Sequence, residues 1–156
     1  MAQIELVFLP ARPMTSPTRK SKVLFVCIGN SCRSPMAEAI ALRDAAELFE
    51  TSSAGLRPLG VVQKLTLETI AANGYSAEGL YSKAIANHVW AEADLVVNMS
   101  GFPRQRAFPR GEWDKVEDWE VDDPFGTERH EYQRVFEDIR TRIESLKVRL
   151  REKAAE

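Results

Sequence analysis

The sequence has few cysteines and histidines, and this scarcity excludes several classes of site. Its 156 residues include two cysteines and two histidines. These are too few, and His88 and His130 lie too far away in sequence, to form a structural zinc site, so we expect no metal. Both cysteines stand in one short stretch, which is not the disulfide framework of a small secreted protein. The chain also has neither a Walker A motif nor a dinucleotide fingerprint, and we expect no cofactor.

The chain also lacks an excess of either charge and any long apolar run. It has 21 basic and 23 acidic residues, a net charge of −2, which provides no global field to hold nucleic acid or an anionic membrane. An apolar stretch over residues 4–9 is interrupted by Glu5, has no basic residue before it and is too short to span a membrane. We therefore expect a cytoplasmic protein without nucleic-acid or membrane partners.

The length and composition predict a single domain. A chain of 156 residues with 44% hydrophobic residues can bury one sizeable core. Pro10, Pro13 and Pro17 mark an exposed linker, so residues 1–21 are interpreted as an N-terminal extension and linker and residues 22–156 as the folded domain. Residues 1–9 either add an edge strand or form a loose tail. The sequence leaves the oligomeric state open, and we expect a monomer.

Apolar runs alternate with amphipathic segments along the domain. This alternation predicts an α/β fold of three layers, in which a four-stranded parallel sheet is flanked by helices. Ser34 is the candidate N-cap of the first helix, with Pro35 at its first helical position. Residues 101–111 are expected to be a loop. The expected strands cover residues 23–26, 51–54, 94–99 and 115–119, and the expected helices cover residues 34–49, 63–73, 87–93 and 132–150.

The loop after the first strand combines a thiol with a guanidinium. Cys27 opens the loop, Arg33 closes it, and the amides between them can surround one tetrahedral anion such as phosphate or arsenate. A helix N-terminus, converging N–H groups and an adjacent cation favour the thiolate form of a cysteine. Attack by such a thiolate on a phosphoryl group would form a phosphocysteine. The alternative is a buried structural cysteine at a strand end.

The other residues of this loop fit an anion cradle. Gly29 removes bulk beside the anion, and Asn30 tolerates the positive φ that a cradle needs. Ser34 can donate to the thiolate or cap the helix. Cys32 either traps oxidised Cys27 as a reversible disulfide or packs behind the loop. The candidate phosphate-binding residues are Ile28, Gly29, Asn30, Ser31, Cys32, Arg33 and Ser34.

A second candidate motif lies near the end of the domain. Asp123 precedes Pro124, which stiffens the backbone, and Gly126 allows a turn, so the carboxylate can be presented in a fixed direction as a general acid. Phe125 could stack on a substrate ring or guanidinium. An ordinary turn before a helix is the alternative interpretation.

With these two motifs, the chain resembles the low-molecular-weight protein tyrosine phosphatases, which share their fold with thioredoxin-coupled arsenate reductases. The resemblance covers roughly residues 22–150 and includes Ser53-Ala54-Gly55 as a third, weaker match. It implies that Cys27 is the nucleophile, Arg33 the phosphate clamp and Asp123 the general acid and then base. Ser34 would stabilise the thiolate, and Asn30 and Ser53 would brace the loop.

Several departures from the family pattern leave the substrate open. The segment from Trp119 resembles the reductases, but their two later cysteines are missing. Ser100 replaces the usual Asp, and Leu80 or Tyr81 stands where a bracing His is expected. Leu59 lies near the position of an aromatic pocket wall in the eukaryotic members. Ser31 replaces a bulky aliphatic residue and is similar to the small hydroxyl residue of bacterial protein-arginine phosphatases.

Three functions follow from these observations. The first is a cysteine-dependent phosphatase that hydrolyses phosphotyrosine-type or phosphoarginine residues of proteins. The second is an arsenate reductase that uses an external thiol. The third is a non-catalytic module that binds phosphate or phosphoproteins. The expected partner is accordingly a phosphorylated protein or a small phosphate or arsenate substrate.

Overall fold

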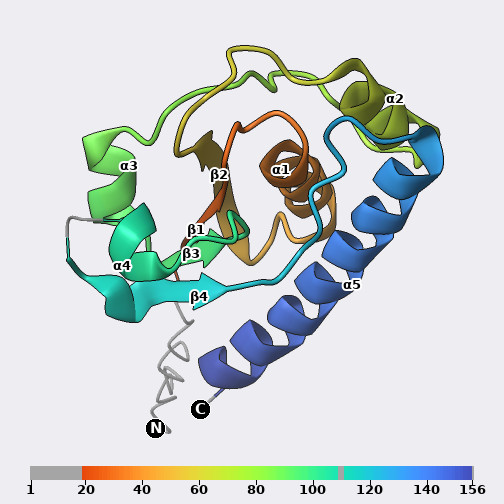
Figure 1. The fold of residues 1–156 in the computed structure, drawn as a ribbon. Helices are drawn as coiled ribbons and strands as arrows, with labels where there is room; N and C mark the ends of the chain where they lie inside the picture. Colours follow the sequence, from red (N-terminus) through yellow and green to blue (C-terminus); the bar gives the residue numbers. More distant parts are fainter. Residues whose placement is uncertain (1–18, 109–110, 156) are drawn as a thin grey trace, which may run out of the picture.

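The first strand, β1 (Ser21–Cys27), lies inside the sheet because its central residues are apolar on both faces. The computed structural model describes residues 19–108 and 111–155 (Figure 1). In this part of the chain, one four-stranded sheet has the order β2-β1-β3-β4, and all of its pairs are parallel. The prediction of a parallel four-stranded α/β fold is therefore confirmed. Most of the predicted extension, residues 1–18, lies outside the described residues.

The remaining elements alternate between strands and helices along the chain. The register of the sheet aligns Cys27 with Gly55 and Val26 with Asn98, so the strands end side by side. The elements after β1 are α1 (Arg33–Asp44), β2 (Phe49–Gly55), α2 (Lys64–Ala72), α3 (Asn87–Glu92), β3 (Leu95–Asn98), α4 (Arg104–Ala107), the 3-10 helix η1 (Trp113–Lys115), β4 (Val116–Asp118) and α5 (Arg129–Ala154).

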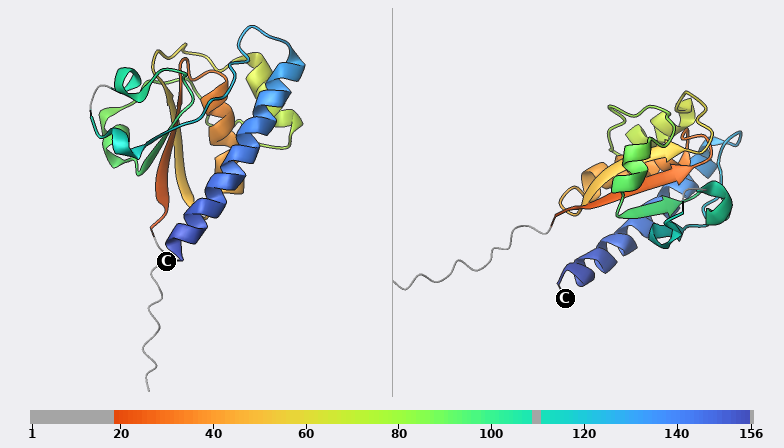
Figure 2. Two further views of the ribbon diagram at one scale, coloured as in Figure 1. Left: turned by 60° about the horizontal axis from the view of Figure 1, so that its bottom comes forward. Right: turned by 90° about the vertical axis from the view of Figure 1, so that its left-hand side faces the viewer.

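Alternate side chains of β1 enter two separate apolar cores. Val23 and Phe25 pack with α1 and α5, whereas Leu24 and Val26 pack with Trp90 of α3. Figure 2 shows α5 along one face of the sheet and the segment of α3 and α4 on the other. One face of α5 (Arg129–Ala154) is apolar and lies on the core side: Tyr132, Val135, Phe136, Ile139, Ile143 and Leu146 are buried, and Leu150 is partly buried.

Two local predictions were wrong. The first helix ends at Asp44 instead of continuing to Phe49, because Phe49 is buried as the first residue of β2, opposite Ser21. A buried aromatic residue after a helix fits the last turn of that helix as well as the start of a strand, and only the strand pairing shows which of the two is formed. The segment predicted as loop 101–111 contains α4, a single turn that is too short to produce a helical apolar pattern.

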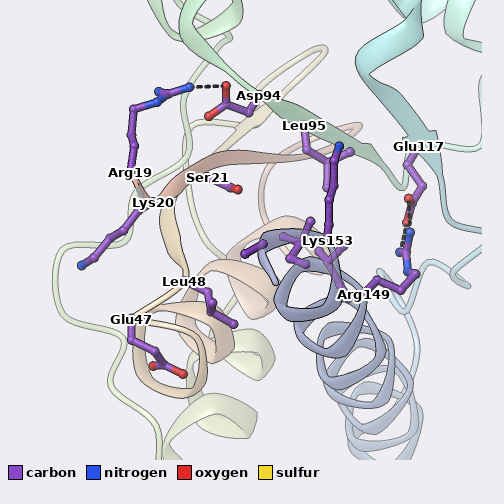
Figure 3. Close-up of a pocket in the computed structure, with 13 residues that line it drawn as sticks. Arg19, Lys20, Ser21, Glu47, Leu48, Asp94, Leu95, Glu117, Arg149 and Lys153 are labelled. Atoms are coloured by element: carbon purple, nitrogen blue, oxygen red, sulfur yellow. Dashed lines mark hydrogen bonds and ion pairs between the residues drawn. The ribbon is translucent and has the colours of Figure 1, made fainter. Parts of the chain in front are cut away.

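The two ends of the sheet differ in their surroundings. At the amino ends of the strands, a hollow of about 550 Å³ is rimmed by the ion pairs Arg19–Asp94 and Glu117–Arg149 (Figure 3). The carboxyl ends, where ligands bind in parallel α/β sheets, carry the loop from Cys27 to Arg33. None of the helices described within residues 19–108 and 111–155 has the length and apolar character to cross a membrane.

Candidate active site

The loop between β1 and α1 starts at the point of the sheet where the strand order reverses. In the sheet, β2 pairs with one edge of β1 and β3 pairs with its other edge, so the strand order reverses direction at β1. Ligands of parallel α/β sheets bind at such switch points. The loop is held against the segment after β2 by backbone hydrogen bonds. Leu56 N–H donates to Cys27 O at 3.1 Å, and Arg57 N–H donates to Ile28 O at 2.8 Å. Two distant segments therefore fix the loop together.

Cys27 lies at the bottom of the loop beside Ser34. Its sulfur is 3.0 Å from Ser34 Oγ and accepts a hydrogen bond from Ser34 N–H at 3.4 Å. The prediction that Ser34 is the N-cap of α1 was wrong. The helix begins one residue before Ser34, at Arg33, and Cys32 occupies the cap position. The hydroxyl takes the other role open to it, contact with Cys27.

A buried hydrogen-bond network extends from Ser34 through Asn30. Asn30 has a φ of 49°, the positive φ predicted for this position. Its Nδ2 donates to Ser34 Oγ at 2.7 Å and to Ser53 Oγ at 3.0 Å, and its Oδ1 accepts from Lys83 N–H at 3.0 Å. The structure thus brings Asn30, Ser34 and Ser53 together, three of the residues predicted for the site.

Sequence reasoning missed two members of this network, Glu38 and Lys83. Ser53 Oγ donates to Glu38 Oε1, and the Lys83 ammonium lies 3.7 Å from the same oxygen. The segment in which Leu80 or Tyr81 replaces the expected bracing His therefore contacts Asn30 through the main-chain N–H of Lys83. Glu38 could have been found, since it lies four residues after Ser34 and hence on the same face of a helix.

Arg33 is buried and held in place by main-chain carbonyls. Its Nη1 donates to Met99 O at 2.6 Å and to Val121 O at 3.2 Å. Its Nη2 lies 3.3 Å from Asp123 Oδ2, while its buried Nε meets no acceptor among the described residues. A buried donor without a protein acceptor is what an anion-binding site leaves for its ligand. Sequence alone could not reveal the carbonyl contacts, since every residue has a carbonyl group.

Asp123 and Phe125 lie on the rim of the pocket above this loop. The pocket has a volume of about 200 Å³, and both Cys27 and Arg33 line it. The Asp123 side chain is 46% exposed, and its Oδ1 accepts a hydrogen bond from Phe125 N–H at 3.1 Å. Leu59 and Arg57 line the same pocket from the segment after β2. The structure therefore places Cys27, Arg33 and Asp123 around one cavity, although the last two lie far apart in the sequence.

Cys32 is a free thiol that lines the same pocket but is buried. Its sulfur lies 3.6 Å from the Tyr132 hydroxyl and 3.8 Å from Ser31 Oγ. Burial raises the pKa of the Cys32 thiol, which hydrogen bonding to Tyr132 only partly offsets. Burial also raises the pKa of Tyr132, so both groups keep their protons at neutral pH.

Ser31 belongs to both the pocket and the support of the loop. Its main-chain oxygen accepts hydrogen bonds from Thr66 Oγ1 at 2.8 Å and from Gln63 N–H at 3.1 Å, which tie the loop to the start of α2. Its side chain lines the pocket beside Gly29. Within the described chain, no three His, Cys, Asp or Glu side chains are grouped to hold a metal ion.

Comparison with known proteins gives one family. The family model described as low molecular weight phosphotyrosine protein phosphatase matches residues 22–156. A protein of Staphylococcus xylosus named arsenate reductase is 34% identical over 130 residues, which are 83% of this chain and 98% of that protein.

Solved structures show the same fold. The YwlE arginine phosphatase from Geobacillus stearothermophilus matches with a TM-score of 0.75 and 26% identity, over 85% of this chain and 94% of that one. An arsenate reductase in the phosphate binding state matches with a TM-score of 0.73 and 28% identity, over 83% of this chain and 98% of that one. Since the family model covers nearly all of the described residues, this chain belongs to the low molecular weight phosphotyrosine protein phosphatase family.

Proposed function

We propose that this protein is a phosphatase that hydrolyses phosphorylated protein residues through a phosphocysteine intermediate. The observation that carries the proposal is the position of Asp123, whose carboxylate lies at the mouth of the pocket formed by Cys27 and Arg33. Hydrolysis of a phosphate ester needs a nucleophile, a clamp for the phosphoryl oxygens and an acid for the leaving group. These three groups meet in this cavity.

The reaction would proceed in two steps. The Cys27 thiolate attacks phosphorus, the bond to the leaving oxygen or nitrogen breaks, and protonated Asp123 gives that atom its proton. In the second step the Asp123 carboxylate takes a proton from water as this water attacks phosphorus, which breaks the sulfur–phosphorus bond and releases phosphate. Arg33 Nε, which has no protein acceptor in the described chain, and the loop amides would stabilise the oxygens in both transition states.

The direction of the buried hydrogen bonds supports a thiolate at Cys27. An amide nitrogen only donates, so Ser34 Oγ must accept from Asn30 Nδ2 and keeps its own proton for another acceptor. Cys27 sulfur lies at 3.0 Å, whereas the other acceptor, Ala54 O, lies at 3.4 Å. The Ser53 proton points to Glu38, which leaves the Ser53 oxygen free to accept from Asn30. The network therefore orients the Ser34 hydroxyl as a donor to the sulfur.

The substrate class is argued from the rim of the pocket. A cavity of about 200 Å³ with Leu59 and Phe125 at its entrance fits one planar phosphorylated side chain. Phe125 is 52% exposed and could stack on a phenyl ring or a guanidinium. Phosphotyrosine and phosphoarginine both have this shape, and small Ser31 in the lining leaves room for either.

Arsenate reduction with an external thiol is the second candidate, and the curated relatives favour it more directly than hydrolysis. The 34% identical protein of Staphylococcus xylosus is named arsenate reductase. Cys27 would displace hydroxide from arsenate, and an external thiol would then attack the Cys27 sulfur and release arsenite with a mixed disulfide. A second thiol would reduce that disulfide. The chain has only two cysteines, and Cys32 is buried and protonated, so the electrons would come from small thiols.

One panel of assays separates these functions. Wild type and Cys27→Ser are compared on a phosphotyrosine peptide, a phosphoarginine peptide and arsenate with glutathione, mycothiol or thioredoxin. The phosphatase proposal predicts phosphate release by the wild type, a trapped phosphocysteine and no turnover by Cys27→Ser. Thiol consumption with arsenate but no phosphate release would establish the second candidate. Binding of phosphate without any turnover would contradict both and leave a binding module.

A further inference from the structure

A second hollow lies next to the candidate active site. It has a volume of about 310 Å³ and is lined by Ile28, Leu56, Arg57, Phe102, Arg106 and Ala107. Ile28 and Arg57 also line the pocket of Cys27, so the two cavities adjoin at these residues. A ligand larger than a single phosphorylated side chain could therefore fill both.

The position of Arg57 relative to the catalytic loop is fixed by the backbone. Arg57 N–H donates to Ile28 O at 2.8 Å, and Leu59 N–H donates to Gly29 O at 2.9 Å. These two backbone hydrogen bonds hold the segment after β2 alongside the loop. The spacing between the anion cradle and the base of the Arg57 side chain is therefore constant, as a specificity site requires.

The hollow contains two guanidinium groups and no acidic residue. The side chains of Arg57 and Arg106 are exposed and make no ion pair or hydrogen bond to another described residue. The neighbouring Arg104, by contrast, pairs with Asp118 at 3.1 Å. Because the whole chain has a net charge of −2, this positive potential is local. Two arginines can hold a carboxylate by charge-assisted, bidentate hydrogen bonds.

The apolar part of the lining favours a side chain over a free anion. Phe102 is 44% exposed at the hollow, and Leu56 and Ala107 add further apolar surface. The methylene groups of an aspartate or glutamate could cover this surface while the carboxylate reaches the arginines. A free small anion such as phosphate or arsenate would leave the apolar surface exposed.

We infer that this hollow is a specificity subsite that binds an acidic residue flanking the phosphorylated residue of a protein substrate. The inference rests on the proposed phosphatase function and deepens it. Arg57 and Arg106 hold the flanking carboxylate while the neighbouring phosphorylated side chain fills the pocket of Cys27. The protein then selects acidic phosphorylated segments over basic or neutral ones.

The test uses phosphotyrosine peptides that differ only in flanking residues. Glutamates at the two positions on either side are replaced one at a time by glutamine, and kcat/KM is measured with the full chain. The wild type should prefer glutamate at one or more positions by about tenfold, mainly through KM, which corresponds to about 1.4 kcal/mol. Arg106→Gln should lose this preference and change kcat/KM for the all-glutamine peptide by less than about twofold.

A charge reversal and a matched control complete the experiment. Arg106→Glu should prefer a lysine-flanked peptide, a gain that a folding defect cannot produce. Arg151→Gln removes an exposed arginine near the C-terminal end of α5, where it pairs with Glu47 at 3.2 Å and does not line the hollow, and should keep the wild-type preference.

The outcomes separate the subsite from the activity. Wild-type turnover of all peptides at equal kcat/KM would overturn the subsite and leave the phosphatase proposal standing. A preference that persists in Arg106→Gln would also overturn it. No turnover of any phosphorylated peptide would refute the phosphatase proposal, and the subsite with it.

Discussion

Replacing Gly55 with alanine should displace the loop from Cys27 to Arg33, and so disable the proposed phosphatase, without introducing backbone strain. Gly55 ends β2 in register with Cys27, and its backbone does not have the positive φ that only glycine tolerates well. A Cβ at this position would lie 2.8 Å from Ile28 O, 2.9 Å from Asn30 N and 3.0 Å from Asn30 Cβ. All three atoms belong to the loop that surrounds the candidate anion site.

The size of the effect follows from these distances. An ordinary contact needs about 3.4 Å or more, so the loop or β2 must move by about 0.6 Å. Active-site groups must be held within about 0.5 Å, and a displacement of about 1 Å can lower a rate by about 100-fold. We expect kcat/KM for an aryl phosphate to fall by about 10- to 100-fold. Overpacking should lower the free energy of unfolding by about 1–3 kcal/mol.

Gly79→Ala is the matched control for this substitution. Gly79 has a φ of +83°, and a Cβ added to it would meet no atom within 4 Å, so the cost of the change comes from backbone strain alone. The substitution should lower the free energy of unfolding by about 1–2 kcal/mol, measured in urea, with unchanged kcat/KM. If Gly55→Ala kept the wild-type kcat/KM, or if both variants lost activity equally, the argument from close approach would be refuted.

Three further predictions concern the acid, the network and the two thiols. Asp123→Asn should lower kcat for a phosphotyrosine peptide by about 10²–10⁴-fold but affect para-nitrophenyl phosphate, whose leaving group needs less protonation, far less; equal losses would contradict a general acid. Glu38→Ala should lower the free energy of unfolding in urea by about 1–3 kcal/mol, because the Ser53 hydroxyl loses its acceptor and the Lys83 ammonium loses its ion-pair partner; an unchanged urea midpoint would speak against this contact. Iodoacetate at pH 7 should alkylate Cys27, and phosphate should slow the reaction. Cys32 should react only at clearly alkaline pH, because its raised pKa keeps the thiol protonated until the pH exceeds the pKa of an ordinary thiol. Peptide mapping that found Cys32 modified before Cys27 would contradict this.

The sequence predicted those parts of the molecule whose determinants are local. The apolar run of β1 and the stripe on α5 reflect burial on a sheet, and both elements were predicted in type and place. The position of the loop from Cys27 to Arg33 between a strand and a helix was also predicted, because its residues are consecutive, and its role as an anion cradle stays a prediction. The end of α1 was not predicted, since an apolar Phe49 suits a helix or a strand until the pairing with Ser21 is known.

The parts that sequence reasoning missed depend on contacts between distant segments. The carbonyls of Met99 and Val121 hold Arg33, and no side-chain pattern reports where a carbonyl points. Lys83 meets Asn30 through its main-chain N–H, which any residue but proline provides. The roles of Cys27, Arg33 and Asp123 remain predictions that the mutations above can test.

The two carbonyl bonds of Arg33 also bear on how the proposed cradle would receive an anion. A free arginine side chain loses about 2 kcal/mol of rotamer entropy when it is immobilised. Here Met99 and Val121 have already immobilised the guanidinium when the protein folds, so an arriving anion does not meet that cost. Folding therefore supplies the ordering, and under the proposed function the affinity for phosphate would depend mainly on new hydrogen bonds. A lysine at this position has a flexible stem and no planar fork, so it could match the charge but not this preorganisation.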